Sequence, residues 1–351
     1  MAEERFITST LNQQDEKFDG SLRPQSFDDF PGQDLQKEKL LIYVQAAKER
    51  NEALGHVLLS GPPGLGKTTL AHIIANARGK EIKTSSGPVI EKPGDLAGLL
   101  ASLETGDILF IDECHRLSTN IEEYLYSAME DFYIDIVLDQ GAAARSIRFD
   151  INPFTLIGAT TRQGMISSPL RSRFGLHVRL DYYAPPVLQT IIVRSAGILN
   201  IEIDTDGAFE IARRCRGTPR IANHLLRWVR DYAQIKADNA INPDVATAAL
   251  KMMKIDADGL DEMDNRYLEA LLYKYDGGPV GIKTLAVALG EEPDTIEEVY
   301  EPFLIQEGFL QRTPKGRIST AKTMARFGVR KPHPDTHPEL FETNGPGGSS
   351  D

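Results

Sequence analysis

Short apolar runs alternate with helical stretches over the first half of the chain. Residues 56–60 (HVLLS), 107–112 (DILFID) and 154–158 (FTLIG) are continuous apolar runs, typical of strands that are buried on both faces. A helical run over residues 69–77 follows the first of them. Strands that alternate with helices in this way predict an α/β core on a parallel sheet, which we assign to residues 22–184.

The pattern changes at Pro185-Pro186, where we expect the chain to break. Helical periodicity then predicts four helices, at residues 187–200, 206–215, 220–238 and 242–254. Asp204 and Asn242 are the expected helix caps. These stretches predict a small all-helical domain over residues 185–256, and the acidic, glycine-containing segment at residues 256–264 marks its end.

The last ordered part, residues 257–331, is predicted to be a winged helix. Helical stretches near residues 265–275, 282–289 and 295–307 precede two short strands around a Pro-Lys-Gly turn. Three helices followed by a hairpin are the order of that fold. Residues 1–21 and the proline- and glycine-rich residues 332–351 are expected to be disordered.

The composition fits a protein of the cytoplasm. Cys114 and Cys215 are the only cysteines, with no CxxC, which argues against a disulfide framework or a zinc site. No apolar run approaches the roughly 20 residues of a membrane span. The polar, mixed-charge N-terminus is not typical of a signal peptide.

The charge distribution modifies what the net charge of −12 indicates. An acidic protein is an unusual partner for nucleic acid, but residues 312–331 hold seven basic residues and no acidic one. Such a local field can hold phosphates on an acidic protein. DNA binding, if it occurs, should therefore be confined to this patch; the alternative is a solvated basic face.

A glycine-rich loop lies between the first strand and the first helix of the core. Its sequence, GPPGLGKTT at residues 61–69, has the spacing and the context of a P-loop. Gly64 and Gly66 would let backbone N–H groups curl around phosphates, with Thr69 entering the helix. Lys67 would reach the β- and γ-phosphates of ATP, and the Thr68 hydroxyl would bind Mg²⁺.

Two carboxylates end the second apolar strand, 45 residues after Lys67. Asp112 can hold a water on Mg²⁺, and Glu113 can polarise the attacking water. An isolated Asp-Glu pair at a strand end is commonly a solvated loop. Beside a P-loop it predicts ATP hydrolysis, because a protein that only binds nucleotide would not need Glu113.

Further segments, in order from about residue 22 to 328, resemble the RuvB family of AAA+ ATPases. They are LRP…FDDFPGQ, DECHRL, AMEDF, AARSI, LIGATTR, SPLRSRFG, RGTPRIAN and GFLQRTPKGR. Cys114 departs from the isoleucine usual in DEIHRL, and residues 139–142 depart from the usual hairpin turn. The resemblance implies an AAA+ core with a helical lid and a winged helix. It also implies an ATP-driven hexameric motor that migrates Holliday junctions in recombination and DNA repair, with RuvA and RuvC as partners.

The resemblance also implies roles for single residues of the ATPase site. Thr161 matches sensor 1, although neighbouring Thr160 could be confused with it and a turn threonine is the alternative. Arg173 matches the arginine finger that acts on the next subunit, with Arg171 as the other candidate. Arg220 matches sensor 2. Leu22, Arg23 and Tyr183 match the adenine and ribose pocket, with simple packing as the alternative.

Two regions would bind partners. The alternating segment at residues 131–151 predicts an inserted hairpin. In the family this hairpin docks onto RuvA, here through Ile134, Ile136 and Ile147; core packing is the alternative. Arg312 and Arg317 match DNA-contacting positions and, with Lys315, would follow the backbone of double-stranded DNA without reading bases.

The sequence is also compatible with two other functions. A clamp-loader subunit shares the ATPase core, but it usually has a Ser-Arg-Cys finger where this chain has Ser172-Arg173-Phe174. An ATP-gated DNA-binding regulator would turn over negligibly, and Glu113 and Arg173 together argue against it.

Overall fold

The computed structural model describes residues 20–137 and 146–329. The chain forms two compact units that divide between Gly259 and Leu260. The first contains the α/β core and the helical lid, and the second is the winged helix, so the predicted fold class is confirmed. Each unit is described by itself.

Five parallel strands form the central sheet of the core. In spatial order they are β2 (Ile82–Ser86), β3 (Ile108–Asp112), β6 (Thr155–Thr160), β1 (Val57–Ser60) and β7 (Leu176–Arg179). All three apolar runs of the sequence are therefore strands of this sheet. Their carboxyl ends share one edge, which is where ligands bind in open α/β sheets.

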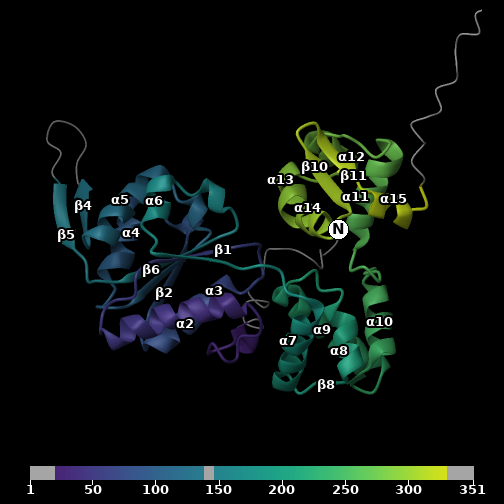
Figure 1. The fold of residues 1–351 in the computed structure, drawn as a ribbon, viewed down its shortest axis with the longest axis horizontal. Helices are drawn as coiled ribbons and strands as arrows, with labels where there is room; N and C mark the ends of the chain where they lie inside the picture. Colours follow the sequence, from purple (N-terminus) through teal and green to yellow (C-terminus); the bar gives the residue numbers. More distant parts are fainter. Residues whose placement is uncertain (1–19, 138–145, 330–351) are drawn as a thin grey trace, which may run out of the picture. The chain divides into compact units, whose positions relative to one another are not determined.

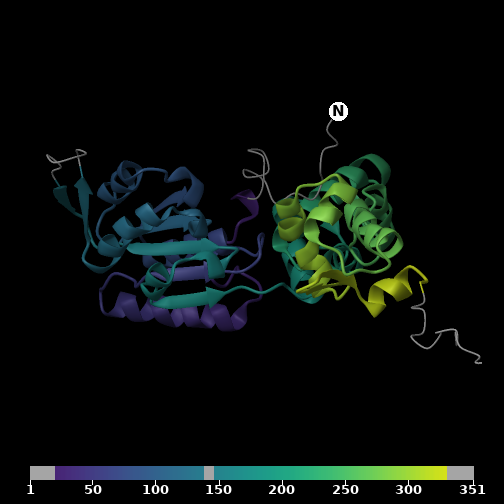
Figure 2. The ribbon, with the colours of Figure 1, turned by 90° about the horizontal axis from the view of Figure 1, so that it is seen from above.

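Helices cover both faces of the sheet (Figures 1 and 2). One face carries α2 (Asp34–Glu49) and α3 (Lys67–Arg78); the other carries α4 (Pro93–Ala101), α5 (Thr119–Glu130) and α6 (Ser168–Ser172). Within β1, Val57 and Leu59 belong to the apolar cluster of the first face and Leu58 to that of the second. Alternate residues thus fill two cores, which explains why the strand is apolar throughout.

The predicted inserted hairpin is present beside α5. Its strands, β4 (Tyr133–Val137) and β5 (Ser146–Asp150), pair antiparallel and form a sheet of their own (Figure 1). The predicted turn at Asp139-Gln140-Gly141 lies outside the described residues.

The lid consists of four helices and a two-stranded parallel sheet. The elements are α7 (Pro185–Ile198), β8 (Glu202–Ile203), α8 (Thr205–Ala212), α9 (Pro219–Lys236), β9 (Ala240–Ile241) and α10 (Pro243–Met252). The core gives way to helices at Pro185-Pro186, as expected, but α7 begins two residues before the predicted residue 187: both prolines lie in its first turn, where proline's missing N–H is not needed. The Asp204 and Asn242 caps are confirmed, since their side chains accept from Gly207 N and Val245 N.

The loop between α8 and α9 binds the last residues of the first unit. Arg213 Nη1 donates to the Ala257 carbonyl at 2.8 Å, and Arg216 Nε donates to the Gly259 carbonyl at 3.2 Å. Arg216 is buried and has a φ of +51°, an uncommon conformation for a residue with a side chain. The segment that leads to the winged helix is therefore fixed to the lid at its start.

The winged-helix unit has its own apolar core. Its elements are α11 (Glu262–Glu269), a π-helical turn (Ala270–Lys274), α12 (Ile282–Leu289), α13 (Pro293–Thr295), a second π-helical turn (Ile296–Tyr300), α14 (Glu301–Gln306), β10 (Leu310–Thr313), β11 (Gly316–Ser319) and α15 (Ala321–Arg326). The two strands pair antiparallel around the Pro-Lys-Gly turn, as predicted. Helix α15 is absent from the prediction. Over the described ranges, none of the helices has the length and apolar character needed to cross a membrane.

Candidate active site

The P-loop joins β1 to α3, and its glycines adopt conformations that other residues rarely reach. Gly61, Gly64 and Gly66 have φ values of +138°, +79° and +97°. A Cβ on Gly61 would lie 2.4 Å from the Leu180 carbonyl oxygen, and one on Gly66 would lie 3.0 Å from the Phe30 ring. Glycine is thus required at these positions. The loop leads directly into the positive end of α3, an arrangement that favours phosphate.

Lys67 lies inside this loop. It is the first residue of α3, is only 6% exposed, and donates from Nζ to the carbonyl oxygens of Gly61 and Pro62, both at 2.8 Å. Burial lowers the pKa of Lys67 to about 8, while the charges of Asp112 and Glu113 act to raise it. The ammonium group therefore sits in the field of the two carboxylates that end β3.

The residues expected to hold Mg²⁺ lie beside one another. Thr68 Oγ1, on α3, is 3.5 Å from Asp112 Oδ2, at the end of β3, and Asp112 Oδ1 accepts from Glu113 N at 2.9 Å. A hydroxyl and a carboxylate are hard oxygen ligands, and Mg²⁺ usually takes one or two of these together with waters and substrate phosphates. The pair fits this ion.

Glu113 has a strained backbone and a fixed side chain. Its φ of +48° lies in the left-handed region, and residues other than glycine with this backbone conformation are often found at functional sites. Its Oε2 accepts from Thr161 Oγ1 at 3.2 Å and lies 3.2 Å from His115 Nδ1. Thr160 instead lies 3.0 Å from His115 through its hydroxyl. The two neighbouring threonines are thus distinguished: Thr161 contacts Glu113 directly, and Thr160 contacts the histidine.

His115 is not among the residues that the sequence predicts. Its side chain is 5% exposed and is held between Glu113 and Thr160. Burial and the nearby charge of Arg162 lower the pKa of His115. Its only sequence signal is a polar residue two positions after Glu113, which the pattern alone does not separate from a loop residue.

Arg220 approaches the P-loop from the lid. It lies in the first turn of α9, and its backbone N donates to the Gly64 carbonyl at 3.4 Å. A Cβ on Gly64 would lie 3.1 Å from the Cβ of Arg220, so glycine is needed here for close approach as well. The charge of Arg220 acts to lower the pKa of Lys67, which places both cations in one field.

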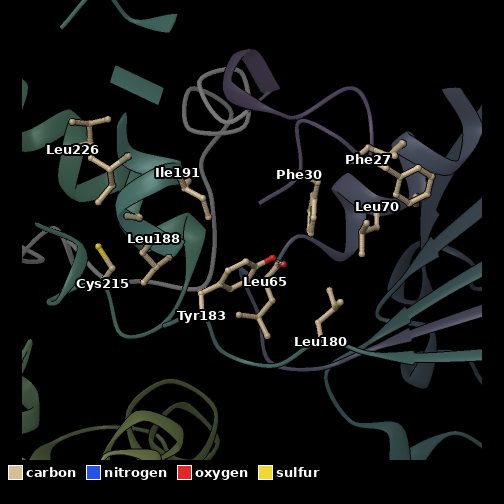
Figure 3. Packing of buried hydrophobic residues seen from close by; sticks show 14 of the residues in the cluster. Phe27, Phe30, Leu65, Leu70, Leu180, Tyr183, Leu188, Ile191, Cys215 and Leu226 are labelled. Carbon is tan, nitrogen blue, oxygen red and sulfur yellow. Dashed lines mark hydrogen bonds between the residues drawn. The ribbon is translucent and has the colours of Figure 1, made fainter. Parts of the chain in front are cut away.

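Tyr183 packs between the P-loop and the lid (Figure 3). Its hydroxyl donates to the Leu65 carbonyl at 3.1 Å, and its backbone N donates to the Gly217 carbonyl at 2.8 Å. Leu22 is also buried, and its carbonyl accepts from Arg194. Burial lowers the pKa of His72 on α3, and the charge of Arg23 lowers it further. A base or ribose contact for Leu22, Arg23 or Tyr183 stays a prediction.

Arg173 contacts α5 and α6 of its own subunit. It caps the C-terminus of α6, and its Nη2 lies 2.9 Å from Glu130 Oε2. Its Nη1 donates to the Pro169 carbonyl at 2.8 Å. Arg171 is half-buried, and its carbonyl faces His177. An action of either arginine on a neighbouring subunit stays a prediction.

The inserted hairpin exposes some of its apolar residues. Ile147 and Phe149, both on β5, are 41% and 46% exposed. Ile136 pairs with Ile147 through the backbone. Ile134 is 2% exposed and belongs to an apolar cluster of the core. The expectation that the Ile134 side chain faces a partner is therefore wrong in this conformation, because it anchors the hairpin to the core.

The wing arginines are bound to acidic residues within the winged helix. Glu301 is fully buried; its Oε1 accepts from Arg317 Nε at 2.9 Å, and its Oε2 accepts from Arg312 Nε. Arg317 also pairs with Glu297, and its side chain is 12% exposed. Lys315 is exposed at the turn. Arg317 therefore has a structural role, whatever it contacts outside the subunit.

Comparisons with known proteins bear on the chain from residue 22 to 328. The model of the Holliday junction DNA helicase RuvB P-loop domain matches residues 22–180, that of the RuvB AAA lid domain residues 183–256, and that of the RuvB C-terminal winged helix domain residues 257–328.

Relatives of known name cover almost the whole chain. The Holliday junction branch migration complex subunit RuvB of Chlorobaculum parvum is 58% identical over 328 residues, which is 93% of this chain and 95% of that protein. The protein of the same name from Chlorobaculum tepidum is 58% identical over 329 residues, 93% of this chain and 94% of its own. The solved structure of the Thermotoga maritima RuvB Holliday junction branch migration motor has a TM-score of 0.81 at 51% identity, covering 89% of this chain and all of that one.

Proposed function

Because this chain belongs to the RuvB family of AAA+ ATPases, we propose that it is an ATP-driven motor for Holliday junction branch migration. The observation that carries the proposal is the convergence of Lys67, Thr68, Asp112 and Glu113 at one edge of the sheet. Lys67 and Thr68 begin α3, while Asp112 ends β3 and Glu113 follows it, so the two pairs are 45 residues apart in sequence. Together they supply what cleavage of a bound triphosphate requires.

The chemistry follows from the roles of these groups. Glu113 polarises a water, whose oxygen forms a bond to the γ-phosphorus of ATP while the bond from that phosphorus to the β,γ-bridging oxygen breaks. The proton of the water passes to solvent or phosphate, and ADP and inorganic phosphate leave. Lys67 stabilises the charge on the phosphate oxygens. Thr68 and Asp112 would hold Mg²⁺, which neutralises phosphate charge when bound.

The fixed position of Glu113 supports its role as the residue that orients water. Thr161 and His115 hold its carboxylate, and its backbone is in the left-handed region. Arg220 is close enough to the P-loop to respond to the phosphates and to move the lid with them. Arg173 would complete the site of the next subunit in a hexameric ring, as the resemblance to the RuvB family implies; within its own subunit it contacts Glu130 and Pro169.

The DNA and protein partners belong to the same proposal. Arg312, Lys315 and Arg317 lie on the wing and would contact the phosphate backbone of double-stranded DNA, while Arg317 is also bound to the buried Glu301. The exposed Ile147, with Ile136 opposite it in the strand pair, would dock onto RuvA. RuvC would join the same complex, in the cytoplasm where its DNA substrate lies.

Dissociation of a synthetic four-way junction tests the function. Wild-type protein should separate the arms only with ATP and Mg²⁺, and faster when RuvA is added. Glu113→Gln should still bind ATP but neither hydrolyse it nor move the junction. A clamp loader or an operator-binding regulator would leave the junction intact, and that result would end the proposal.

A further inference from the structure

The strongest unassigned feature near the site is the acidic residue that contacts Arg173. Glu130 ends α5 and its side chain is 57% exposed, yet it holds Arg173 Nη2 at 2.9 Å. A carboxylate at the C-terminus of a helix is locally unfavourable, because it adds to the negative end of the helix dipole. Helix stability alone therefore does not account for Glu130, but its contact with a cation does.

Two further contacts fix the same guanidinium group. Nη1 donates to the Pro169 carbonyl at 2.8 Å, and the guanidinium carbon lies 4.5 Å from the centre of the Tyr126 ring. The Tyr126 hydroxyl lies 3.1 Å from that of Ser167, which caps α6. This hydrogen bond links α5 to the start of α6 beside Arg173. Among the described residues, Glu130 is the ion-pair partner of this guanidinium group.

We infer that Glu130 is a positioning residue that holds Arg173 in the orientation from which it reaches the phosphates of the neighbouring subunit. This rests on the proposed function, in which Arg173 acts in trans. An arginine side chain has many rotamers, and ordering it costs conformational entropy. If the side chain is ordered before the ring assembles, this cost is not added to the free energy of the transition state. Nη1 and Nη2 each donate once within the subunit, and each keeps a second N–H donor for a phosphate. Arg173 Nε is buried and has no acceptor in the part of the chain that the structure describes, so it is not one of these donors.

Glu130→Gln removes the charge with little change in shape. The turnover number for ATP should fall about tenfold, because the arginine is present but poorly oriented, whereas KM for ATP should stay unchanged. Glu123→Gln, an exposed change on the same helix, should leave turnover unchanged. Ring formation and melting temperature are measured for each variant, so that a folding defect is recognised.

The double variant separates positioning from other roles. If Glu130 acts only through Arg173, Glu130→Gln should have no further effect in an Arg173→Ala background. A loss that persists there would overturn the inference. Unchanged turnover of Glu130→Gln, with Arg173→Ala inactive, would overturn it as well but leave the proposed function standing. An active Arg173→Ala would instead refute the finger assignment itself.

Mixed rings test the action across the subunit boundary. Glu113→Gln subunits have an inactive pocket and an intact finger, while Glu130→Gln subunits have the reverse. Random mixing in equal amounts should restore turnover to about a quarter of wild type, since one boundary in four joins an intact pocket to an intact finger. Turnover equal to the mean of the two separate variants would show that Glu130 acts within its own subunit, and would refute the inference.

Discussion

The Thr161 hydroxyl donates to Glu113 Oε2 at 3.2 Å, across the ends of two neighbouring strands. The residue proposed to orient the attacking water is therefore itself held by the residue expected to sense the γ-phosphate.

Removing this hydroxyl should slow hydrolysis without weakening ATP binding. Thr161→Val keeps the shape but leaves Glu113 with less support, so the turnover number should fall roughly 10- to 100-fold, as for other small misplacements of catalytic groups. Nucleotide affinity, measured by fluorescence titration, should change little. Thr161→Ser retains the donor and serves as the control; an equal loss in Thr161→Ser would show that the hydrogen bond to Glu113 does not account for the effect.

The exposed lysine of the wing should contribute to DNA binding through charge alone. Lys315→Ala should reduce the slope of log affinity against log salt by about 0.9, the loss expected for one phosphate contact. The reduction should be the same on unrelated duplex sequences. A loss on one sequence only would indicate that bases are read and would contradict backbone tracking.

The wing arginine with the buried partner should matter for stability as well as for DNA. Arg317→Ala leaves the buried Glu301 carboxylate with Arg312 and the Tyr267 hydroxyl as partners, so the loss should stay below the roughly 3 kcal/mol that a buried charge without any partner costs. Thermal unfolding of the winged helix should show this loss, and Lys315→Ala should not. If Arg317→Ala unfolds like wild type, the ion pair carries no net stability and Arg317 is free to serve DNA alone.

A buried histidine should make stability depend on pH. His56 Nδ1 accepts from Leu156 N at 2.8 Å, and its Nε2 donates to the Met129 carbonyl at 3.0 Å, so the neutral ring is held at both nitrogens. Burial lowers the pKa of His56 from its ordinary 6.5, and the Met129 hydrogen bond offsets this only in part. The ring is otherwise faced by the uncharged Phe154 ring.

The sign follows from proton uptake. Below pH 6.5 the unfolded chain protonates His56 and the folded chain does not, so the free energy of unfolding should fall as the pH drops below this value. Chemical denaturation between pH 7.5 and 5 (about two and a half units around that pKa) should reveal the slope. His56→Leu should reduce it, and the exposed His177→Gln should not; an unaltered slope in His56→Leu would assign the effect to other groups.

The sequence predicts those parts of the molecule that depend on local patterns. The strands β1, β3 and β6 read as apolar runs because both of their faces are buried, and the P-loop reads as glycines at fixed spacing. The helix boundaries are less certain, since Pro185-Pro186 suits a first helical turn as well as a break.

What the sequence does not predict depends on contacts between distant residues. Glu130 and Arg173 are 43 residues apart, and Glu301 and Arg317 are 16 apart. Their charges appear in the sequence, but their pairing depends on the packing of α5 on α6 and of the wing on α14. Ile134 illustrates the same limit: alternation gives a strand its period but does not tell which face the core covers.

Arg216, in the loop between α8 and α9, and Arg220, in the first turn of α9, are four residues apart; the Arg216 side chain is bound to the Gly259 carbonyl, and the Arg220 backbone N to the Gly64 carbonyl of the P-loop. Four residues, the last two of them helical, allow little change in the distance between the two contacts. If the lid moves with the phosphates, as proposed above, Gly259 moves with it, because this short segment joins the P-loop contact to the last residue of the first unit.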